Sequence, residues 1–323
     1  MGIYKAILPK DLALSSYRMN DVSNWTRINT EWMGARKKFI LIPPQAKNKY
    51  MIKFPNYGEN EILIELFNCY LALNLGLKTA SYFPCIYRGE KGIITKSFLK
   101  QDEYGSELWE MKELICHYSG VANIEFKMGR DKEVLLEHDI DLIQMILANE
   151  FGEKILPAFY QMVGFDCLIG HGDRHWCNYG VILSYSSAAK KLEFNFSPIY
   201  DTASGYLLEM TDLQVEEILK NKTLDDTKWY FPKKKGLCKM TCQGNPKTNH
   251  IDLFAYILET EKNPKYIDAL IAPIKKYNSK IVTHLLGNHF SELSSERKSV
   301  IIKILEMRFA ILKELIIQRE HRC

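Results

Sequence analysis

The segment H-G-D-R-H-W-C-N, from His171 to Asn178, carries polar residues of the types and at the spacing that phosphoryl transfer can use. Asp173 precedes Asn178 by five residues, and a second segment, S-P-I-Y-D, ends at Asp201. One carboxylate can accept the proton of an attacking hydroxyl, while an amide and a second carboxylate offer the oxygen ligands that Mg²⁺ prefers. The spacing therefore predicts that Asp173 is a catalytic base and that Asn178 and Asp201 bind a metal.

Two histidines flank the predicted base, and we expect them to hold the loop by hydrogen bonds to backbone or carboxylate groups. They are His171 and His175, and we group His175 with Asp173 as catalytic residues. The alternative is that D-R-H is a surface loop in which the aspartate caps a turn. For the D-x-x-x-x-N spacing taken alone, the two interpretations have about even odds.

The segments around the loop are expected to position it. Residues 161–169 are apolar enough for a buried helix that ends at Gly170. Residues 179–183 fit a strand, 184–191 a turn, and 192–196 a second strand with alternating side chains that runs toward Asp201. The predicted order is thus a helix, the loop, a hairpin and the second acidic motif.

These motifs resemble the catalytic core of the HipA-like kinases, whose pattern is D-x-H-x-x-N followed by P-x-Y-D. The resemblance extends from about Met33 to about Leu258, and D-R-H-x-x-N is also similar to the phosphatidylinositol kinases. It implies an α+β, bilobal, protein-kinase-like fold, with a small lobe of sheet plus helix and a mainly helical large lobe. It also implies ATP and Mg²⁺ as cofactors, and transfer of the γ-phosphate to Ser or Thr hydroxyls of the chain itself and of a protein target.

The match departs from eukaryotic-type protein kinases at two places. Thr202 and Ala203 follow Asp201 where those kinases have Phe and Gly, and Gly172 stands where they have the arginine of H-R-D. An ordinary eukaryotic-type protein kinase is therefore disfavoured.

The amino-terminal third should form the lobe that grips the nucleotide. Residues 37–42 and 49–54 are strand candidates, and apolar residues at helical spacing follow over 62–73. Lys53 alternates with apolar neighbours, and Glu65 is the one interior charge of the helix. Taken alone, they are better explained as solvated surface charges, by roughly three to one. Their order before the loop, together with the resemblance, instead predicts the ion pair that orients a kinase's phosphate-binding lysine.

The segment that would cradle phosphate has no widespread nucleotide-binding motif. Neither G-x-G-x-x-G nor G-x-x-x-x-G-K-[ST] occurs. The segment M-G-A-R-K-K resembles the G-A-x-x-K loop of HipA-like kinases, and the resemblance implies that Gly34, Ala35, Arg36 and Lys38 contact the nucleotide. A plain turn followed by a basic strand is the alternative.

The hinge between the lobes is expected at Ser97 and Phe98, where a strand over residues 91–98 ends and backbone groups could hydrogen-bond adenine. This divides the chain into a nucleotide-gripping N-lobe, 1–97, and a C-lobe, 98–323, that carries the catalytic loop and the metal site. A chain of 323 residues with 46% hydrophobic content can bury one core in each of two lobes.

Charge and targeting signals disfavour several other classes of protein. The net charge of +4 is mild and the basic residues are spread out, so direct nucleic-acid binding is not expected. No segment reaches membrane-spanning length and no signal peptide is evident, which favours a cytoplasmic protein without membrane contact. Eight cysteines, several of them in apolar segments, favour reduced, buried thiols.

Two classes of function stay open. The first is an active Ser/Thr kinase, with a lipid or small-molecule kinase as the alternative enzyme because of D-R-H-x-x-N. The second is a pseudokinase or partner-binding module. We disfavour it by roughly five to one, because a polar residue stands at every position that kinase chemistry requires: Lys53, Glu65, Asp173, Asn178 and Asp201.

The resemblance carries further expectations about regulation and partners. The short segment ahead of the phosphate loop is similar to that of CtkA-type members of the family, for which secretion into a host is the alternative to a cytoplasmic location. A small antitoxin-like partner is also implied. Thr30 is the hydroxyl nearest the position where phosphorylation silences members of the family.

Overall fold

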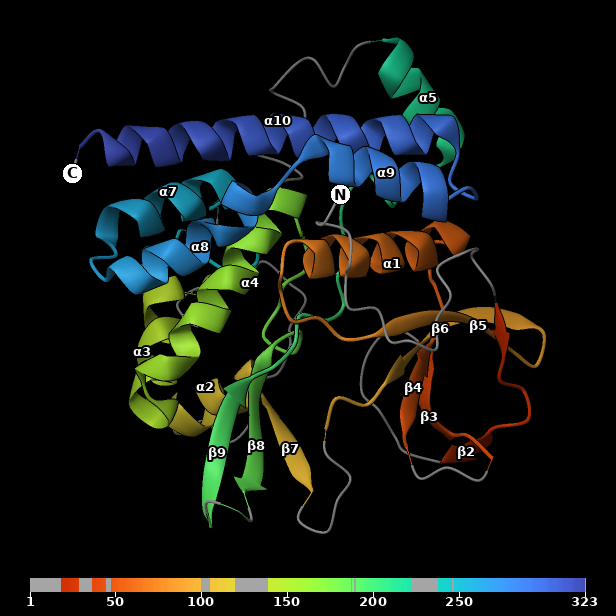
Figure 1. Cartoon of the computed structure of the whole chain (residues 1–323), viewed down its shortest axis with the longest axis horizontal. Coiled ribbons are helices and arrows are strands. Elements are labelled where there is room, and N and C mark those ends of the chain that lie inside the picture. Colours follow the sequence, from red (N-terminus) through yellow and green to blue (C-terminus); the bar gives the residue numbers. More distant parts are fainter. Residues whose placement is uncertain are drawn as a thin grey trace.

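The computed structural model describes residues 19–28, 37–44, 48–99, 105–119, 139–186, 188, 190–221, 238–245 and 247–322. A smaller lobe rich in strands lies beside a larger lobe rich in helices (Figure 1). The α+β class predicted from the sequence is confirmed. The expected phosphate-loop residues Gly34, Ala35 and Arg36, and the expected phosphorylation site Thr30, lie outside the described residues.

The smaller lobe is built on a six-stranded sheet with the order β1-β5-β6-β4-β3-β2, in which only the β1–β5 pair is parallel. One face of the sheet carries its own core, to which β3 contributes Phe39 and Leu41 and β5 contributes Phe83, Cys85 and Tyr87. The strands are β1 (Asn20–Asp21), β2 (Thr26–Ile28), β3 (Lys38–Ile42), β4 (Tyr50–Lys53), β5 (Tyr82–Tyr87) and β6 (Glu90–Lys96). β3 and β4 confirm the two strands predicted over 37–42 and 49–54.

Helix α1 (Glu59–Asn74) confirms the helix predicted over 62–73 and lies between the sheet and the helical lobe (Figure 1). Most of its side chains are buried, including those of two glutamates, because both lobes pack against it. Near its start, Oε2 of Glu61 accepts the backbone N–H groups of Asn56 at 2.8 Å and Tyr57 at 3.0 Å. On its other side Phe67 packs edge-to-face on Phe290, with ring centroids 5.7 Å apart.

Backbone hydrogen bonds after α1 also join the two lobes. Thr79 and Ile199 form a parallel bridge, and the Thr79 hydroxyl donates to the Ile199 carbonyl oxygen at 3.0 Å. The same oxygen accepts the N–H of Ala80 at 2.8 Å, while the Ile199 N–H donates to Lys78 O at 2.9 Å. Since Ile199 lies two residues before Asp201, the chain entering the second acidic motif is fixed to the smaller lobe.

A three-stranded sheet in the order β7-β8-β9 flanks the predicted catalytic loop and consists of β7 (Ser106–Glu110), β8 (Gly180–Ser186) and β9 (Lys191–Phe196). The hairpin strands are longer than predicted, so the turn placed at 184–191 was too long. Ser184 and Ser186 favour turns, but they pair with Glu193 and Lys191 in the ladder. A Cβ at Gly180 would lie 2.1 Å from Trp109 O, so the close approach of β7 requires glycine.

The helical lobe is centred on α4 (Leu156–Ile169), whose second half confirms the helix predicted over 161–169. At Gly164 this helix crosses the helix over 264–276, named α8, so closely that a Cβ would lie 2.1 Å from Leu270 O. The other helices are α2 (Met111–Ser119), α3 (Ile140–Phe151), the 3₁₀ helix η2 (Glu153–Ile155), α5 (Asp212–Lys220), α7 (His250–Thr260), α8 (Pro264–Lys276), α9 (Ser279–His289) and α10 (Ser295–Glu320).

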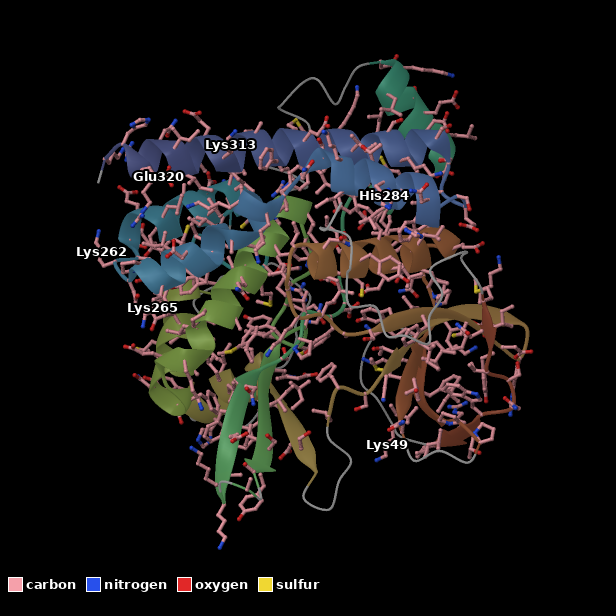
Figure 2. The ribbon with its side chains drawn as sticks, in the orientation of Figure 1. Lys49, Lys262, Lys265, His284, Lys313 and Glu320 are labelled. Carbon is pink, nitrogen blue, oxygen red and sulfur yellow. The ribbon has the colours of Figure 1, made fainter. Side chains whose placement is uncertain are left out.

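Charged side chains cover the outside of the helical lobe. Lys262, Lys265, Lys313 and Glu320 are exposed and are labelled at one end of it, whereas Lys49 marks the sheet of the smaller lobe (Figure 2). Within the described part of the chain, no helix combines the length and the apolar character that a membrane crossing needs.

Candidate active site

The predicted catalytic loop starts where α4 ends at Gly170, which adopts the left-handed conformation with φ 71° and donates its N–H to Asp166 O at 2.8 Å. A Cβ at Gly170 would lie 3.2 Å from the guanidinium of Arg308, a buried residue of α10. The Nε of Arg308 donates to Cys167 O at 2.8 Å. The end of α4, and with it the start of the loop, is therefore fixed by both the loop glycine and α10.

Asp173 and Asn178 are held within one tight loop. The His175 N–H donates to Asp173 O at 2.9 Å, and the Asn178 N–H donates to His175 O at 2.8 Å. The Asn178 side chain donates through Nδ2 to Asp173 O at 2.8 Å, so its Oδ1 is the atom that could bind a cation. Asn178 is buried, whereas Asp173 is half-buried and its carboxylate can meet a substrate.

His171 and His175 lie on either side of the predicted base. His171 is fully buried, and its Nε2 lies 2.8 Å from the carbonyl oxygen of Asp201, so Nε2 carries the hydrogen. The Nδ1 of His175 accepts the N–H of Cys177 at 3.2 Å. Burial lowers the pKa of both imidazoles, that of His171 well below its ordinary value of 6.5. Both rings are therefore neutral near pH 7 and act as hydrogen-bonding groups.

Asp201 lies where the two lobes meet. Its φ of 56° is left-handed, a conformation that is costly for a residue other than glycine and is concentrated at functional sites. Its backbone N–H donates to the hydroxyl of Tyr82, on β5, at 2.9 Å. Its Oδ1 lies 3.2 Å from the Nζ of Lys53, and the two side chains are 24% and 10% exposed. The second acidic motif is thus in direct contact with the smaller lobe.

Two lysines of the six-stranded sheet are neighbours at this point. The antiparallel register of β3 and β4 pairs Lys38 with Lys53, which places both side chains on one face of the sheet. Burial, and then the charge of Lys53, lower the pKa of Lys38, while the carboxylates of Asp201 and Glu110 act in the opposite direction. The pair therefore concentrates positive charge next to Asp201, which is the sign that phosphate groups require.

Glu65 is buried on α1 and contacts the residue that follows Asp201. Its Oε1 accepts the backbone N–H of Thr202 at 2.8 Å and the Thr202 hydroxyl at 3.3 Å. Glu65 and Lys53 line the same small cavity, together with Ile93. Lys53 contacts Asp201 and Glu65 contacts Thr202, so both side chains reach the same segment of the large lobe. A direct ion pair between Lys53 and Glu65 stays a prediction.

Ser97 and Phe98 follow β6 and lead toward the second sheet. The Ser97 N–H donates to the carbonyl oxygen of Lys49 at 2.9 Å, next to the start of β4. The ring of Phe98 packs on Tyr200, with centroids 5.7 Å apart, directly before Asp201. The segment lies between the two sheets, and its expected role in binding adenine stays a prediction.

Sequence reasoning missed the residues that connect these groups. Arg174, in the middle of D-R-H, is buried and donates to the carboxylate of Asp166 on α4 at 2.8 and 2.9 Å. Tyr82 and Thr202, which hold the backbone around Asp201, were missed as well. A signal existed for Asp166, since it is the only charge in the apolar segment 161–169, where a carboxylate without a partner would be costly.

The comparisons with known proteins concern the fold. No protein-family model matches the chain, and no curated protein sequence matches it. Among solved structures it is similar to CtkA, a proinflammatory kinase of Helicobacter pylori, with a TM-score of 0.68 and 19% identity over 93% of this chain and 98% of that one. It is also similar to HipA in the complex of Shewanella oneidensis MR-1 HipA, HipB and operator DNA, with a TM-score of 0.50 and 14% identity over 89% of this chain and 65% of that one. The chain therefore has the bilobal, HipA-like kinase fold that its motifs predicted.

Proposed function

We propose that the chain is an ATP- and Mg²⁺-dependent kinase that transfers the γ-phosphate to Ser or Thr hydroxyls of itself and of a protein target. The observation that carries the proposal is the 3.2 Å contact between Lys53 and Asp201, formed beside the loop of Asp173 and Asn178. Two carboxylates, an amide oxygen and lysine side chains then belong to one site between the lobes. The kinase fold of the two similar structures supports the same conclusion.

The residues present fit a magnesium ion. The carboxylate of Asp201 and the Oδ1 of Asn178 are hard oxygen donors, which Mg²⁺ prefers. Across the residues that the structure describes, no group of three or more His, Cys, Asp or Glu side chains could hold a metal alone. Phosphate oxygens and water would therefore complete the coordination, as is usual for Mg²⁺ with nucleotides. When bound, the ion would neutralise charge on the phosphate oxygens.

The chain's own side chains would divide the remaining work. Asp173 would accept the proton of the substrate hydroxyl while the hydroxyl oxygen forms a bond to the γ-phosphorus. The bond between that phosphorus and the bridging oxygen breaks, and its electron pair leaves with ADP. Lys53 would orient the phosphates, with Lys38 adding positive charge. Asp173 then releases the proton to water.

The test is incubation of the purified protein with ATP labelled on the γ-phosphate and Mg²⁺, followed by a search for label on protein and on added phosphatidylinositol vesicles. We expect label on Ser or Thr of the protein, and its loss in Asp201→Ala and Asn178→Ala variants that still fold. Label on lipid alone would favour the lipid kinase suggested by D-R-H-x-x-N. Nucleotide binding without any transfer would favour a pseudokinase.

A small antitoxin-like partner is a second proposal, supported by the structure in which HipA stands with HipB and operator DNA. Because this chain covers only 65% of that HipA chain, surfaces of the longer protein are not all represented in it. Co-purification of a small protein encoded by a neighbouring gene, with loss of labelling on binding, would support the partner. Kinase activity that stays the same in the presence of each protein encoded by a neighbouring gene would contradict the proposed partner.

A further inference from the structure

Arg174 touches both segments that carry the proposed metal ligands. Its guanidinium is buried, and Nη1 donates to the carbonyl oxygen of Asn178 at 3.0 Å and to that of Tyr200 at 2.6 Å. Asn178 is itself a proposed ligand, and Tyr200 directly precedes Asp201. Since the two carbonyl oxygens share one donor nitrogen, they can lie no further apart than the sum of these two distances.

The opposite edge of the guanidinium is fixed to the centre of the helical lobe. Nε and Nη2 donate to the two carboxylate oxygens of Asp166 at 2.8 and 2.9 Å, the forked geometry that suits arginine and that lysine cannot form. Burial raises the pKa of the Asp166 carboxyl although Arg174 acts in the opposite direction. For Arg174, desolvation acts to lower the pKa, but the charge and hydrogen bonds of Asp166, together with the charge of Asp201, outweigh it and the pKa is raised. Taking both charges out of water is costly, so a buried ion pair is weak evidence for stability, and stability alone is a poor reason for this pair.

We infer that Arg174 is a positioning residue: it sets the separation of the Asn178 and Asp201 segments, and hence the spacing of the two oxygen ligands offered to a divalent cation. This inference rests on the proposed function, which assigns those two residues to the cation. Mg²⁺ demands near-ideal octahedral geometry, so a change in ligand spacing weakens its binding. A lysine in place of Arg174 would keep a positive charge near Asp166 but could not hold both carbonyl oxygens.

Arg297 on α10 provides a matched control. It is also fully buried, and it donates from Nε and Nη2 to Oδ1 of Asp212 at 3.2 and 2.7 Å. It further donates to the carbonyl oxygens of Leu207 at 2.9 Å and Met210 at 2.7 Å. An Arg297→Lys variant therefore loses contacts of the same kind, one carboxylate and two carbonyls, without losing a contact to Asn178 or Tyr200.

The experiment compares the wild-type, Arg174→Lys and Arg297→Lys proteins. Electron paramagnetic resonance measures Mn²⁺ binding in the presence of a non-hydrolysable ATP analogue, and turnover is followed against Mg²⁺ concentration. For Arg174→Lys we expect metal binding weakened by about 10–100-fold, as for other residues that orient metal ligands, and a matching rise in the Mg²⁺ concentration at half-maximal turnover. Saturating Mg²⁺ should restore much of the rate. Arg297→Lys should bind Mn²⁺ as the wild type does, even where its thermal unfolding temperature falls.

The possible results separate this inference from the proposed function. Metal binding by Arg174→Lys as tight as that by Arg297→Lys would overturn the inference and leave a kinase in place. A wild-type protein that binds no metal with the nucleotide analogue would refute the proposed function, and the inference with it.

A second variant covers the case in which Arg174→Lys does not fold. The double variant Asp166→Leu/Arg174→Met replaces the buried ion pair by apolar side chains, an exchange that protein cores often tolerate. It should fold and still bind Mn²⁺ more weakly, because the two carbonyl oxygens have lost their shared donor. Binding equal to that of the wild type would again overturn the inference.

Discussion

The two walls of the candidate site are built in different ways. The large-lobe wall, which is the loop 171–179 with Asp201, is held by backbone hydrogen bonds and by buried side chains beneath it. The small-lobe wall is the pair Lys38 and Lys53, which the register of two strands places side by side. Lys53 reaches the opposite wall at the tip of a long side chain. The first wall supplies a fixed geometry, whereas the second supplies charge on side chains with many rotamers.

This difference implies two kinds of defect. A substitution in the large-lobe wall should remove the chemistry or change the metal requirement, because its groups are already in place before substrate arrives. A substitution in the small-lobe wall should instead change how the phosphates are oriented. The following substitutions test this contrast in order of decreasing effect on activity.

The largest effect is expected for Asp173→Asn in the large-lobe wall. The amide cannot accept the proton of the substrate hydroxyl, so the rate of transfer should fall by about 10²–10⁴-fold, the usual contribution of a general base. Initial rates with labelled ATP measure this loss, and the affinity for ATP should stay near that of the wild type. Because the side chain is half-buried and the two residues have the same shape, the thermal unfolding temperature should not change. A variant as active as the wild type would show that Asp173 is not the base.

Lys53→Met in the small-lobe wall should have the next largest effect. The variant keeps the apolar stem and removes the charge, so the phosphates lose their orientation and turnover should fall by about 10²-fold. Lys96→Met is the matched control, since Lys96 ends the neighbouring strand β6 and is exposed. Turnover measured with labelled ATP should be low for Lys53→Met and close to that of the wild type for Lys96→Met. Equal turnover in both would make Lys53 an ordinary lysine and would remove the contrast between the walls.

Glu65→Ala should produce a smaller loss of activity, because it acts through Thr202. The buried Thr202 N–H would lose its acceptor at a cost of about 1–3 kcal/mol, and a shift of the adjacent Asp201 should lower turnover by about tenfold. Glu61→Ala is the control on the same helix, because Glu61 also accepts backbone N–H groups but at the start of α1. Both variants should unfold at a lower temperature, and only Glu65→Ala should be slower per folded molecule. The same slowing in both would mean that the Thr202 contact has no special role.

Asp212→Asn, which lies outside both walls, should leave activity unchanged, lower stability at neutral pH and have little effect on stability in acid. Desolvation acts to raise the pKa of Asp212, but the hydrogen bonds and charge of Arg297, together with hydrogen bonds from Ser294 and Asn60, outweigh it and hold the pKa below 3.8. The unfolded state therefore takes up its proton first as the pH falls, so the carboxylate stabilises the fold above pH 3.8 and this contribution is lost at lower pH. Urea unfolding should show a difference between variant and wild type at neutral pH that shrinks in acid. A difference that does not depend on pH would exclude the charge as its cause.

The sequence predicted the elements of the site better than the contacts between them. Strands β3 and β4 and helix α1 could be recognised because apolar residues repeat with the period of each element, and α4 because its second half is apolar almost throughout. The contact of Lys53 with Asp201 could not, since it depends on how the two lobes pack, and no local pattern encodes that packing. Arg174 likewise has the composition of a surface loop residue, because arginine is rarely buried without a partner and its partner Asp166 lies on another element. The fold class, in contrast, followed from the resemblance of the motifs and their order to those of the HipA-like kinases.

The hydrogen bonds that Ile199 makes with Lys78 and Ala80 restrict how the lobes can swing. They fasten the small lobe to the large one at the chain that enters β5, near one edge of the six-stranded sheet. A rotation of the small lobe that preserves these hydrogen bonds must have its axis close to this edge of the sheet. Asp201, two residues from the axis, would scarcely move, while β3 and β2 at the opposite edge would travel furthest. A rotation of this kind would thus carry Lys38, on β3, through a wider arc than Asp201.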